Sequence, residues 1–322
     1  MIDAQTKASL ALSRANLGGA IRKKTDSIYE NLRNVVSGVY ATIDFPDEDL
    51  SSLSEDEIRA GVQNAINALE SLQRSYKTGH AVCEGVRTVI FGKPNTGKST
   101  ILNLLAEQER AIVTDIAGTT RDVISETVAA GNVTLRLFDT AGVHGTDDFV
   151  ERIGVQKSME ALENAELILA VFDGSVAPAE EDRALAESLL HTDATVIAII
   201  NKSDLGIAEQ EFYTSHFSHT VTLSAKDGEG IEALSALVES CFINGELDTK
   251  KDTVLTNARQ KGAALSALEA IKRAREGLAY GLPVELCCSD CEAAMQAIAE
   301  LDGRAVSEDI VSHIFSHFCV GK

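Results

Sequence analysis

A glycine-rich segment that ends in a lysine and a serine has the residue types needed to bind phosphate. Residues 89–100 read Val-Ile-Phe-Gly-Lys-Pro-Asn-Thr-Gly-Lys-Ser-Thr, with the Gly-x4-Gly-Lys-Ser spacing of a phosphate-binding loop. Main-chain N–H groups and the positive end of the following helix would converge on the phosphates. We expect Lys98 to reach the outer phosphates and Ser99 to ligate Mg²⁺. Taken alone, the segment could also be an ordinary strand–helix turn. The predicted nucleotide-binding residues here are Asn95, Thr96, Gly97, Lys98, Ser99 and Thr100.

A second motif follows the apolar run 133–138 and reads Asp139-Thr140-Ala141-Gly142. An aspartate at a strand end can hold a Mg²⁺-bound water, and the Gly142 N–H can meet a γ-phosphate. Val143 stands where Ras-like enzymes place the glutamine that orients the attacking water. Water must therefore be positioned by another group, and an ion or a partner must supply electrophilic help.

Two later motifs predict recognition of the base. The tetrapeptide Asn201-Lys202-Ser203-Asp204 follows the apolar run 195–200, and Ser224-Ala225-Lys226 follows the short run 221–223. Asp204 can accept hydrogen bonds from guanine N1–H and the exocyclic amine, which adenine cannot supply. Each motif alone is weak and would usually be a solvated loop. Their order, each after an apolar run, predicts a GTPase.

A threonine-rich segment lies between the first two motifs and is typical of a switch. It spans residues 114–122 and reads Thr-Asp-Ile-Ala-Gly-Thr-Thr-Arg-Asp. Such loops are ordered by Mg²⁺ and γ-phosphate and released after hydrolysis. We expect Thr120 to be the second protein ligand of Mg²⁺. The other predicted cofactor-binding residues of this segment are Thr114, Asp115, Ile116, Ala117, Gly118 and Thr119.

Composition narrows the functional classes. The 322 residues carry a net charge of −20, which argues against a broad basic face for nucleic acid. No secretory signal or membrane-length apolar run is visible, so we expect a cytoplasmic protein. The six cysteines (83, 241, 287, 288, 291 and 319) indicate reduced thiols. The cluster at 287, 288 and 291 lacks a nearby fourth metal ligand, which favours buried thiols over a metal site.

Hydrophobic periodicity predicts three regions. Helical stripes occupy residues 2 to about 80, with one continuous stripe from Leu10 to Ile43 that also includes Leu17, a capping box at Ser54 and Glu57, and a boundary at 76–79. Helices return after 254, in stripes that include Leu265 and, near the end of the chain, residues 306–318. Between them, strands and helices alternate. The predicted strands are Arg87–Phe91, Ser125–Ala129, Val133–Phe138, Leu167–Phe172, Thr195–Ile200 and Val221–Leu223.

These patterns predict an α/β P-loop GTPase domain, with a mostly parallel sheet, inserted into a discontinuous all-α helical domain. The predicted limits are 1–82 for the first helical part, 83–245 for the GTPase (G) domain and 246–322 for the second helical part.

The chain resembles the MnmE (TrmE) family, bacterial GTPases of tRNA wobble-uridine modification. The resemblance spans essentially the whole chain and includes the phosphate loop, residues 111–122 and the Asp-Thr-Ala-Gly motif. It also includes Ile43–Glu48, Glu151–Gly154, Leu255–Arg259 and the terminal Phe-Cys-Val-Gly-Lys of 318–322. The 114–122 segment and the C-terminal Cys-x-Gly-Lys are specific to that family among GTPases.

The resemblance implies K⁺-stimulated hydrolysis and nucleotide-dependent homodimerisation through the G domains. Asn95 matches the family's K⁺-ligating asparagine, and Thr114, Ile116 and Thr119 lie in the matching loop. A cation between the phosphates can neutralise charge that develops on the leaving oxygen. Glu151 corresponds to the family's water-orienting glutamate.

The resemblance also implies an FAD-containing MnmG partner, tRNA bound through the complex, and modification chemistry at Cys319 with Lys322 near a folate. Cys319 could equally be a small residue of the last helix. The family's N-terminal tetrahydrofolate-binding domain has no counterpart in this sequence, so folate use is expected only of a full-length enzyme. A rival hypothesis is a GTP-gated RNA- or ribosome-assembly binding module without modification chemistry. A third, a catalytically silent scaffold, fits poorly with the complete set of Lys98, Ser99, Thr120 and Asp139.

Overall fold

The computed structural model describes residues 6–44, 53–108, 126–137, 164–243 and 253–301. The chain divides into two compact units. The sheet unit comprises Met1–Ala11 and His80–Leu247, and the helical unit comprises Leu12–Gly79 and Asp248–Lys322.

The sheet unit is built on a six-stranded sheet in the order β2-β3-β1-β4-β5-β6. The antiparallel hairpin β2–β3 forms one edge, and the pairings β3–β1, β1–β4, β4–β5 and β5–β6 are parallel. The predicted strands are confirmed, with ends that differ by one residue. Their bounds are β1 Val86–Phe91, β2 Glu126–Ala130, β3 Val133–Leu137, β4 Leu167–Asp173, β5 Thr195–Asn201 and β6 Thr220–Thr222.

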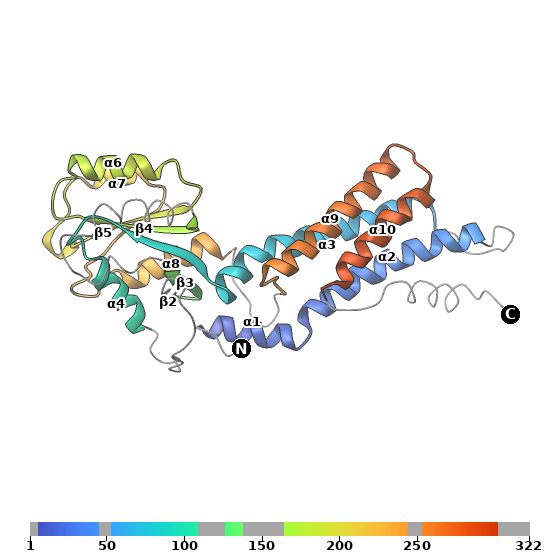
Figure 1. The fold of residues 1–322 in the computed structure, drawn as a ribbon, viewed down its shortest axis with the longest axis horizontal. Coiled ribbons are helices and arrows are strands. Elements are labelled where there is room, and N and C mark those ends of the chain that lie inside the picture. The colour runs from blue at the N-terminus through green and yellow to red at the C-terminus, as the bar shows by residue number, and fades with distance from the viewer. Residues whose placement is uncertain (1–5, 45–52, 109–125, 138–163, 244–252, 302–322) are drawn as a thin grey trace. The chain divides into compact units, whose positions relative to one another are not determined.

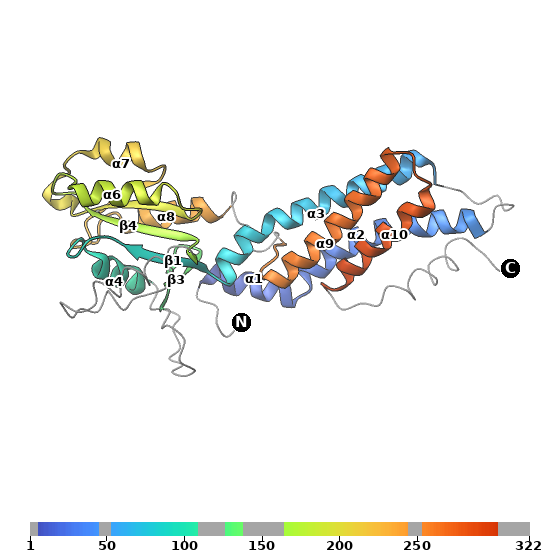
Figure 2. The same ribbon diagram turned by 45° about the horizontal axis from the view of Figure 1, so that its top comes forward.

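Helices cover both faces of this sheet (Figures 1 and 2). Helices α6 (Glu180–Leu189) and α7 (Gln210–His216) bury one face, where Phe172 packs with Phe217 and Tyr213. Helices α4 (Lys98–Gln108) and α8 (Ile231–Phe242) lie on the other face. A sheet covered on both sides needs strands that are apolar on both faces, which is why β4 and β5 read as continuous apolar runs.

The helical unit joins segments from both ends of the chain. Helix α1 (Lys7–Leu17) belongs to this unit from Leu12 onward. The N-terminal flank also supplies α2 (Ala20–Asp44) and most of α3 (Glu55–Cys83). The C-terminal flank supplies α9 (Ala258–Ala279) and α10 (Val284–Ala299). Their interior is one cluster in which Leu32, Leu69, Ile271 and Ile298 are buried. Each flank therefore covers the apolar stripe of the other, as the predicted discontinuous helical domain requires.

Some predicted details of the helices are wrong and others are confirmed. The single stripe from Leu10 to Ile43 is broken between α1 and α2 at Gly19, whose φ of 83° L side chains rarely adopt. Leu10 (42% exposed), Leu17 and Ile43 are not core residues, and Leu265 is also partly exposed. The predicted boundary at 76–79 agrees with the division between the two units, which falls between Gly79 and His80, although helix α3 continues past it to Cys83.

The capping box that starts α3 is present. The Glu57 N–H donates to Ser54 Oγ at 3.3 Å, and the Ser54 N–H donates to Glu57 Oε2 at 2.8 Å. The predicted helix at 306–318 lies outside the described residues.

Candidate nucleotide-binding site

The phosphate loop follows β1, which lies between β3 on one side and β4 on the other, so the strand order reverses at β1. This is the switch point where open parallel sheets bind ligands. A side chain at Gly92 would collide with the Val171 carbonyl oxygen, and one at Gly97 would collide with Asn201 Nδ2. The two glycines are thus required by close approach to neighbouring strands and loops.

The Lys98 ammonium is hydrogen-bonded to main-chain oxygens of the phosphate loop. Its Nζ donates to the carbonyl oxygens of Gly92 at 2.8 Å and Lys93 at 2.6 Å. Burial lowers the pKa of Lys98, because the charged form loses contact with water. Asn95 adopts a left-handed conformation (φ 63°), uncommon outside glycine, on the same loop. The loop is wound tightly around the group that would meet the outer phosphates.

One buried amide joins three loops. Asn201, at the end of β5, donates from Nδ2 to the Thr96 carbonyl oxygen at 2.7 Å. Its Oδ1 accepts the Ala225 N–H at 2.9 Å. Asn201 is only 2% exposed, so both ends of its amide are satisfied without water. The phosphate loop and both predicted base-recognition loops therefore meet at this side chain.

The Asp204 carboxylate is held in place from two sides. Ser224 Oγ lies 3.1 Å from Asp204 Oδ1, and the Lys226 ammonium lies 3.9 Å from Oδ2. Ser224 itself is fully buried. An acceptor-only carboxylate fixed in this way can receive two parallel N–H donors, the pattern of the guanine edge.

Asp173 holds the side chain of Lys202, a role that the sequence did not predict. The Lys202 ammonium donates to Asp173 Oδ2 at 2.6 Å, and the Ser175 N–H donates to Oδ1 at 3.0 Å. Burial acts to raise the pKa of Asp173, but the hydrogen bonds from Lys202 and Ser175 outweigh it and lower that pKa. The available signal was position, since Asp173 ends β4 and pairs in register with Asn201 at the end of β5.

A cavity of about 880 Å³ collects most of the predicted residues that the structure describes. Thr96 and Ser224 do not line it, because both are buried behind it. Sequence reasoning did not identify Leu205 and Pro94, which also border it. The lining residues are Pro94, Asn95, Gly97, Lys98, Ser99, Thr100, Asn201, Lys202, Asp204, Leu205, Ala225 and Lys226.

Other predicted site residues lie outside the described residues. They are Thr114, Asp115, Ile116, Ala117, Gly118, Thr119, Thr120, Asp139, Thr140, Ala141, Gly142, Glu151, Cys319 and Lys322.

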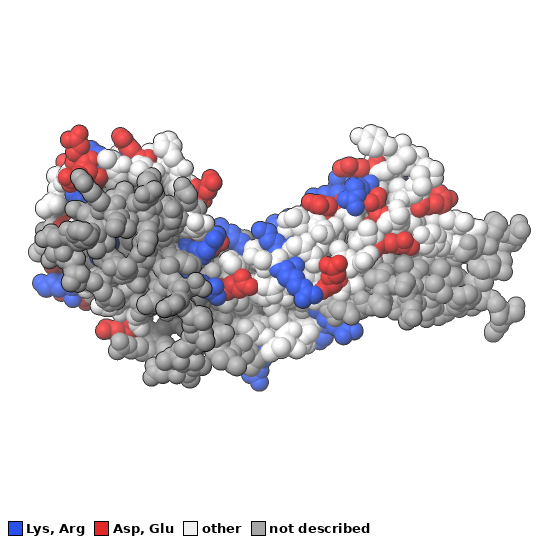
Figure 3. All heavy atoms as spheres, in the orientation of Figure 1, with Lys and Arg blue, Asp and Glu red and all other residues white. Residues whose placement is uncertain are grey.

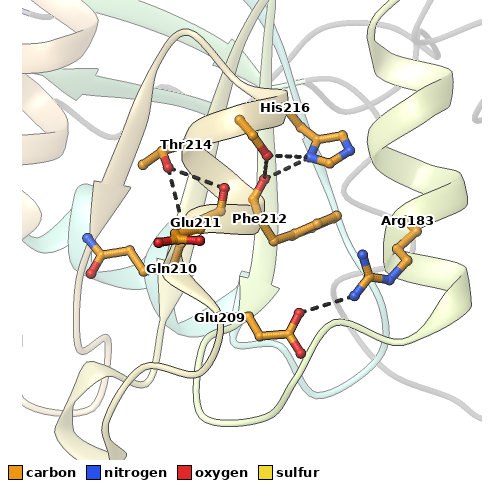
Figure 4. Close-up of a pocket in the computed structure, with 8 residues that line it drawn as sticks. Arg183, Glu209, Gln210, Glu211, Phe212, Thr214 and His216 are labelled. Atoms are coloured by element: carbon orange, nitrogen blue, oxygen red, sulfur yellow. Dashed lines mark hydrogen bonds and ion pairs between the residues drawn. The ribbon is translucent and has the colours of Figure 1, made fainter.

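A second concavity, of about 990 Å³, lies beside α6 and α7 (Figure 4). Several of its polar groups contact their neighbours: Arg183 pairs with Glu209 at 3.1 Å, and His216 Nδ1 lies 2.7 Å from the Phe212 carbonyl oxygen. The Arg183 guanidinium also sits 5.1 Å from the centre of the Phe212 ring. These contacts are explained by packing at the surface of the two helices.

The cysteine cluster lies in the core of the helical unit. Cys287, Cys288 and Cys291 on α10 are buried in the interior cluster, and burial raises the pKa of Cys288 to about 12. Among the residues that the structure describes, no group of three metal-ligating side chains is assembled. These thiols act as small apolar side chains.

Surface charge and helix hydropathy bear on whether the described residues offer a basic face for nucleic acid or a membrane-spanning helix. On the face shown in Figure 3, the described basic and acidic side chains of the helical unit lie interspersed and form no continuous basic surface. Ion pairs of this unit include Lys272–Glu70 at 2.8 Å and Arg273–Asp290 at 3.0 Å. Within the described ranges, no helix combines the length and apolar character needed to cross a bilayer.

The glycine-rich loop at the switch point, the buried asparagine and the fixed Asp204 together define a P-loop, GTP-binding domain inserted into a helical unit. Residues 1–319 match the family model of the MnmE helical domain. The chain is 37% identical over 323 residues to the tRNA modification GTPase MnmE of Lactococcus lactis subsp. cremoris (strain SK11), covering all of this chain and 70% of that protein. It is 39% identical over 328 residues to MnmE of Symbiobacterium thermophilum, with the same coverage. The chain belongs to the MnmE family of tRNA modification GTPases, and it is a GTPase.

A solved structure of an Aquifex aeolicus Era variant bound to GDP·AlF4⁻ resembles part of the molecule. It covers 57% of this chain and 66% of its own, with 26% identity and a TM-score of 0.38. At that TM-score the likeness adds nothing to the assignment, which rests on the sequence relatives and on the loops described above.

Proposed function

We propose that this chain couples K⁺-stimulated GTP hydrolysis to dimerisation of its G domains, as part of wobble-uridine modification of tRNA with an MnmG-type FAD partner. The proposed modification adds a carboxymethylaminomethyl or aminomethyl group, and the proposed setting is the cytoplasm. The proposed domain limits remain 1–82, 83–245 and 246–322.

The observation that carries the proposal is the position of Asn95. Its left-handed backbone sits on the phosphate loop, and it lines the same cavity as Lys98 and Ser99. An amide oxygen is a suitable ligand for a monovalent cation, and this one would lie beside the phosphates. Asn95 would hold K⁺ together with Thr114, Ile116 and Thr119, while Ser99 and Thr120 would hold Mg²⁺. The cations would neutralise charge that develops on the phosphate oxygens during cleavage.

The described residues would bind GTP by exchanging internal contacts for contacts with the nucleotide. The Lys98 ammonium would leave the Gly92 and Lys93 carbonyl oxygens and donate to the outer phosphates. Asp204 would accept the two guanine donors while Asn201 keeps the loops together. Glu151 would orient the attacking water, a role that the residue at 143 cannot fill.

The modification chemistry would lie elsewhere in the chain. Cys319 would take part in it, and Lys322 would lie near a folate-derived one-carbon donor in the full-length enzyme. Both assignments follow from the family's C-terminal motif, and tRNA would be bound through the complex with the MnmG partner.

The test is the GTPase rate as a function of protein concentration in K⁺ and in Na⁺ buffers. We expect a second-order rise in K⁺ that is absent in Na⁺, and its loss in Asn95→Ala with GDP affinity retained. Equal rates in the two buffers, first order in protein, would overturn the potassium-dependent dimerisation. Thermal unfolding of the Asn95→Ala variant serves as the control for its fold.

A further inference from the structure

An ion pair outside the nucleotide cavity fastens the phosphate loop to a helix. Lys93 is the second residue of the loop and is not among the residues that line the cavity. Its ammonium donates to Asp182 Oδ2 at 2.6 Å, across 89 residues of chain. Asp182 lies in the first turn of α6 and is only 7% exposed. The carboxylate end of the contact is therefore shielded from water, whereas the Lys93 side chain is 33% exposed. One buried partner distinguishes the pair from most surface ion pairs.

Helix α6 is a rigid anchor for this contact. Ala186 and Leu189, on the same helix, are buried in the cluster that covers one face of the sheet. The Asp182 carboxylate also accepts the Ala179 N–H at 2.9 Å, which fixes its own orientation. A lysine held by such a carboxylate has little freedom to move, and its pKa is raised, chiefly by the hydrogen bond to Asp182.

Two side chains donate hydrogen bonds to the main chain at residue 93. Its carbonyl oxygen accepts from Lys98 Nζ at 2.6 Å and from Thr96 Oγ1 at 2.9 Å. The first of these is lost when the Lys98 ammonium turns to the phosphates. The loop includes a left-handed Asn95, a conformation that persists only when the surroundings hold it. The side chain of Lys93 then remains as a charged anchor for the loop.

We propose that Asp182 is a positioning residue for nucleotide binding, which acts through Lys93 to keep the phosphate loop wound in its binding shape. Asp182 touches neither phosphate nor base in this arrangement. Its effect is on how long the nucleotide is retained. The inference needs only nucleotide binding by the wild-type chain, so it stands separately from the proposed dimerisation and modification chemistry.

A neighbouring glutamate provides a control variant for the loss of one negative charge near Lys93. Glu181, the neighbour of Asp182, lies 3.6 Å from the same ammonium, but its side chain is 80% exposed. Glu181→Gln removes an equal charge without removing the buried contact. Asp182→Asn keeps an oxygen that can accept the Ala179 N–H, so the start of α6 retains its cap. It removes the negative charge that holds the Lys93 ammonium.

The experiment measures dissociation of a fluorescent N-methylanthraniloyl-GDP in Na⁺ buffer at low protein concentration. Lys93→Met and Asp182→Asn should each release GDP about tenfold faster, as the loss of one charge-assisted hydrogen bond predicts. The double variant should be no faster than either single variant. Lys93→Arg should restore a rate within about twofold of wild type, since the guanidinium can still pair with the carboxylate.

Glu181→Gln should leave the rate unchanged. An unchanged rate in Lys93→Met, or multiplied effects in the double variant, would overturn the proposal. So would failure of Lys93→Arg to restore the rate, which would indicate a purely structural effect. Should Asp182→Asn fold poorly in a thermal scan, the pair Lys93→Met and Lys93→Arg decides the question alone.

Discussion

The two units bury their side chains by different means. Around the nucleotide cavity, buried polar side chains such as Asn201 and Asp182 hydrogen-bond to the phosphate loop, which is distant from both in sequence. The interior of the helical unit is instead apolar, with alanines and cysteines between large side chains such as Leu69 and Met295. Loss of a polar contact in the first region should impair ligand binding, whereas loss of volume in the second should reduce stability.

The helical unit also has polar contacts between its helices, and two of them involve half-buried side chains. Tyr40 Oη donates to Glu292 Oε1 at 3.0 Å, and burial with the neighbouring carboxylate raises the pKa of Tyr40 to about 12. Asn31 Nδ2 donates to the Gly61 carbonyl oxygen at 2.7 Å, where α2 and α3 approach closely. These contacts set the register of helices whose stability comes from the apolar interior.

The largest expected effect is on stability, from truncation of the helical core. Ile271→Ala should lower the free energy of unfolding by about 2–5 kcal/mol, because Ile271 is fully buried and a cavity would remain. Chemical denaturation measures the change, and GDP affinity should stay within about twofold of wild type. Leu265→Ala, on the same helix but 37% exposed, is the control and should cost less than about 1 kcal/mol. A large loss of GDP affinity in Ile271→Ala would contradict the expectation that the helical core affects stability but not nucleotide binding.

A change of base preference is the next largest effect. Asp204→Asn should lower affinity for GDP about a hundredfold, because a carboxylate that accepts two donors becomes an amide that faces one of them with its own donor. Xanthosine diphosphate should gain affinity, since its 2-oxo group can accept from the new amide. Calorimetric titration with both nucleotides measures the exchange, and thermal unfolding should change little. Equal losses for both nucleotides would show that Asp204 only supports the loop.

The smallest effect is a pH dependence at the last turn of α3. His80 Nδ1 lies 3.1 Å from Glu84 Oε2, and His80 Nε2 lies 3.6 Å from Glu166 Oε1. Glu166 also accepts the Arg87 N–H at 3.0 Å. The Glu166 carboxylate raises the pKa of His80 against the opposing effect of burial. His80 is the main cause that lowers the pKa of Glu166 to about 2.

These two shifts define a window of pH. The raised pKa of His80 contributes stability below its ordinary value of 6.5, lost as pH rises through the folded value. The lowered pKa of Glu166 contributes stability above its ordinary value of 4.5, lost as pH falls toward 2. His80→Gln should therefore cost about 1 kcal/mol or less near pH 5.5 and progressively less at alkaline pH. Denaturation of wild type and variant across pH 5–9 measures this, and Glu166→Gln should weaken the same pH dependence, leaving the part that Glu84 contributes.

Much of the site could be predicted because its motifs follow strands. Asn201 and Asp204 line the same cavity as the phosphate loop, since parallel strands bring their carboxyl ends to one edge of the sheet. The helix break at Gly19 and the exposure of Leu17 were not predicted. A periodic pattern continues through a pair of glycines in the sequence, and only the positive φ at Gly19 ends the helix.

The sequence by itself determined the order of strands and motifs, the GTPase class and the helical flanks, because local periodicity and short-range spacing encode them. Only the tertiary structure decided which distant polar groups pair. Lys93 and Asp182 are 89 residues apart, and Thr96 and Asn201 are 105 residues apart. No spacing rule links such residues, since their distance depends on how α6 packs on the sheet and where β5 lies in it relative to β1.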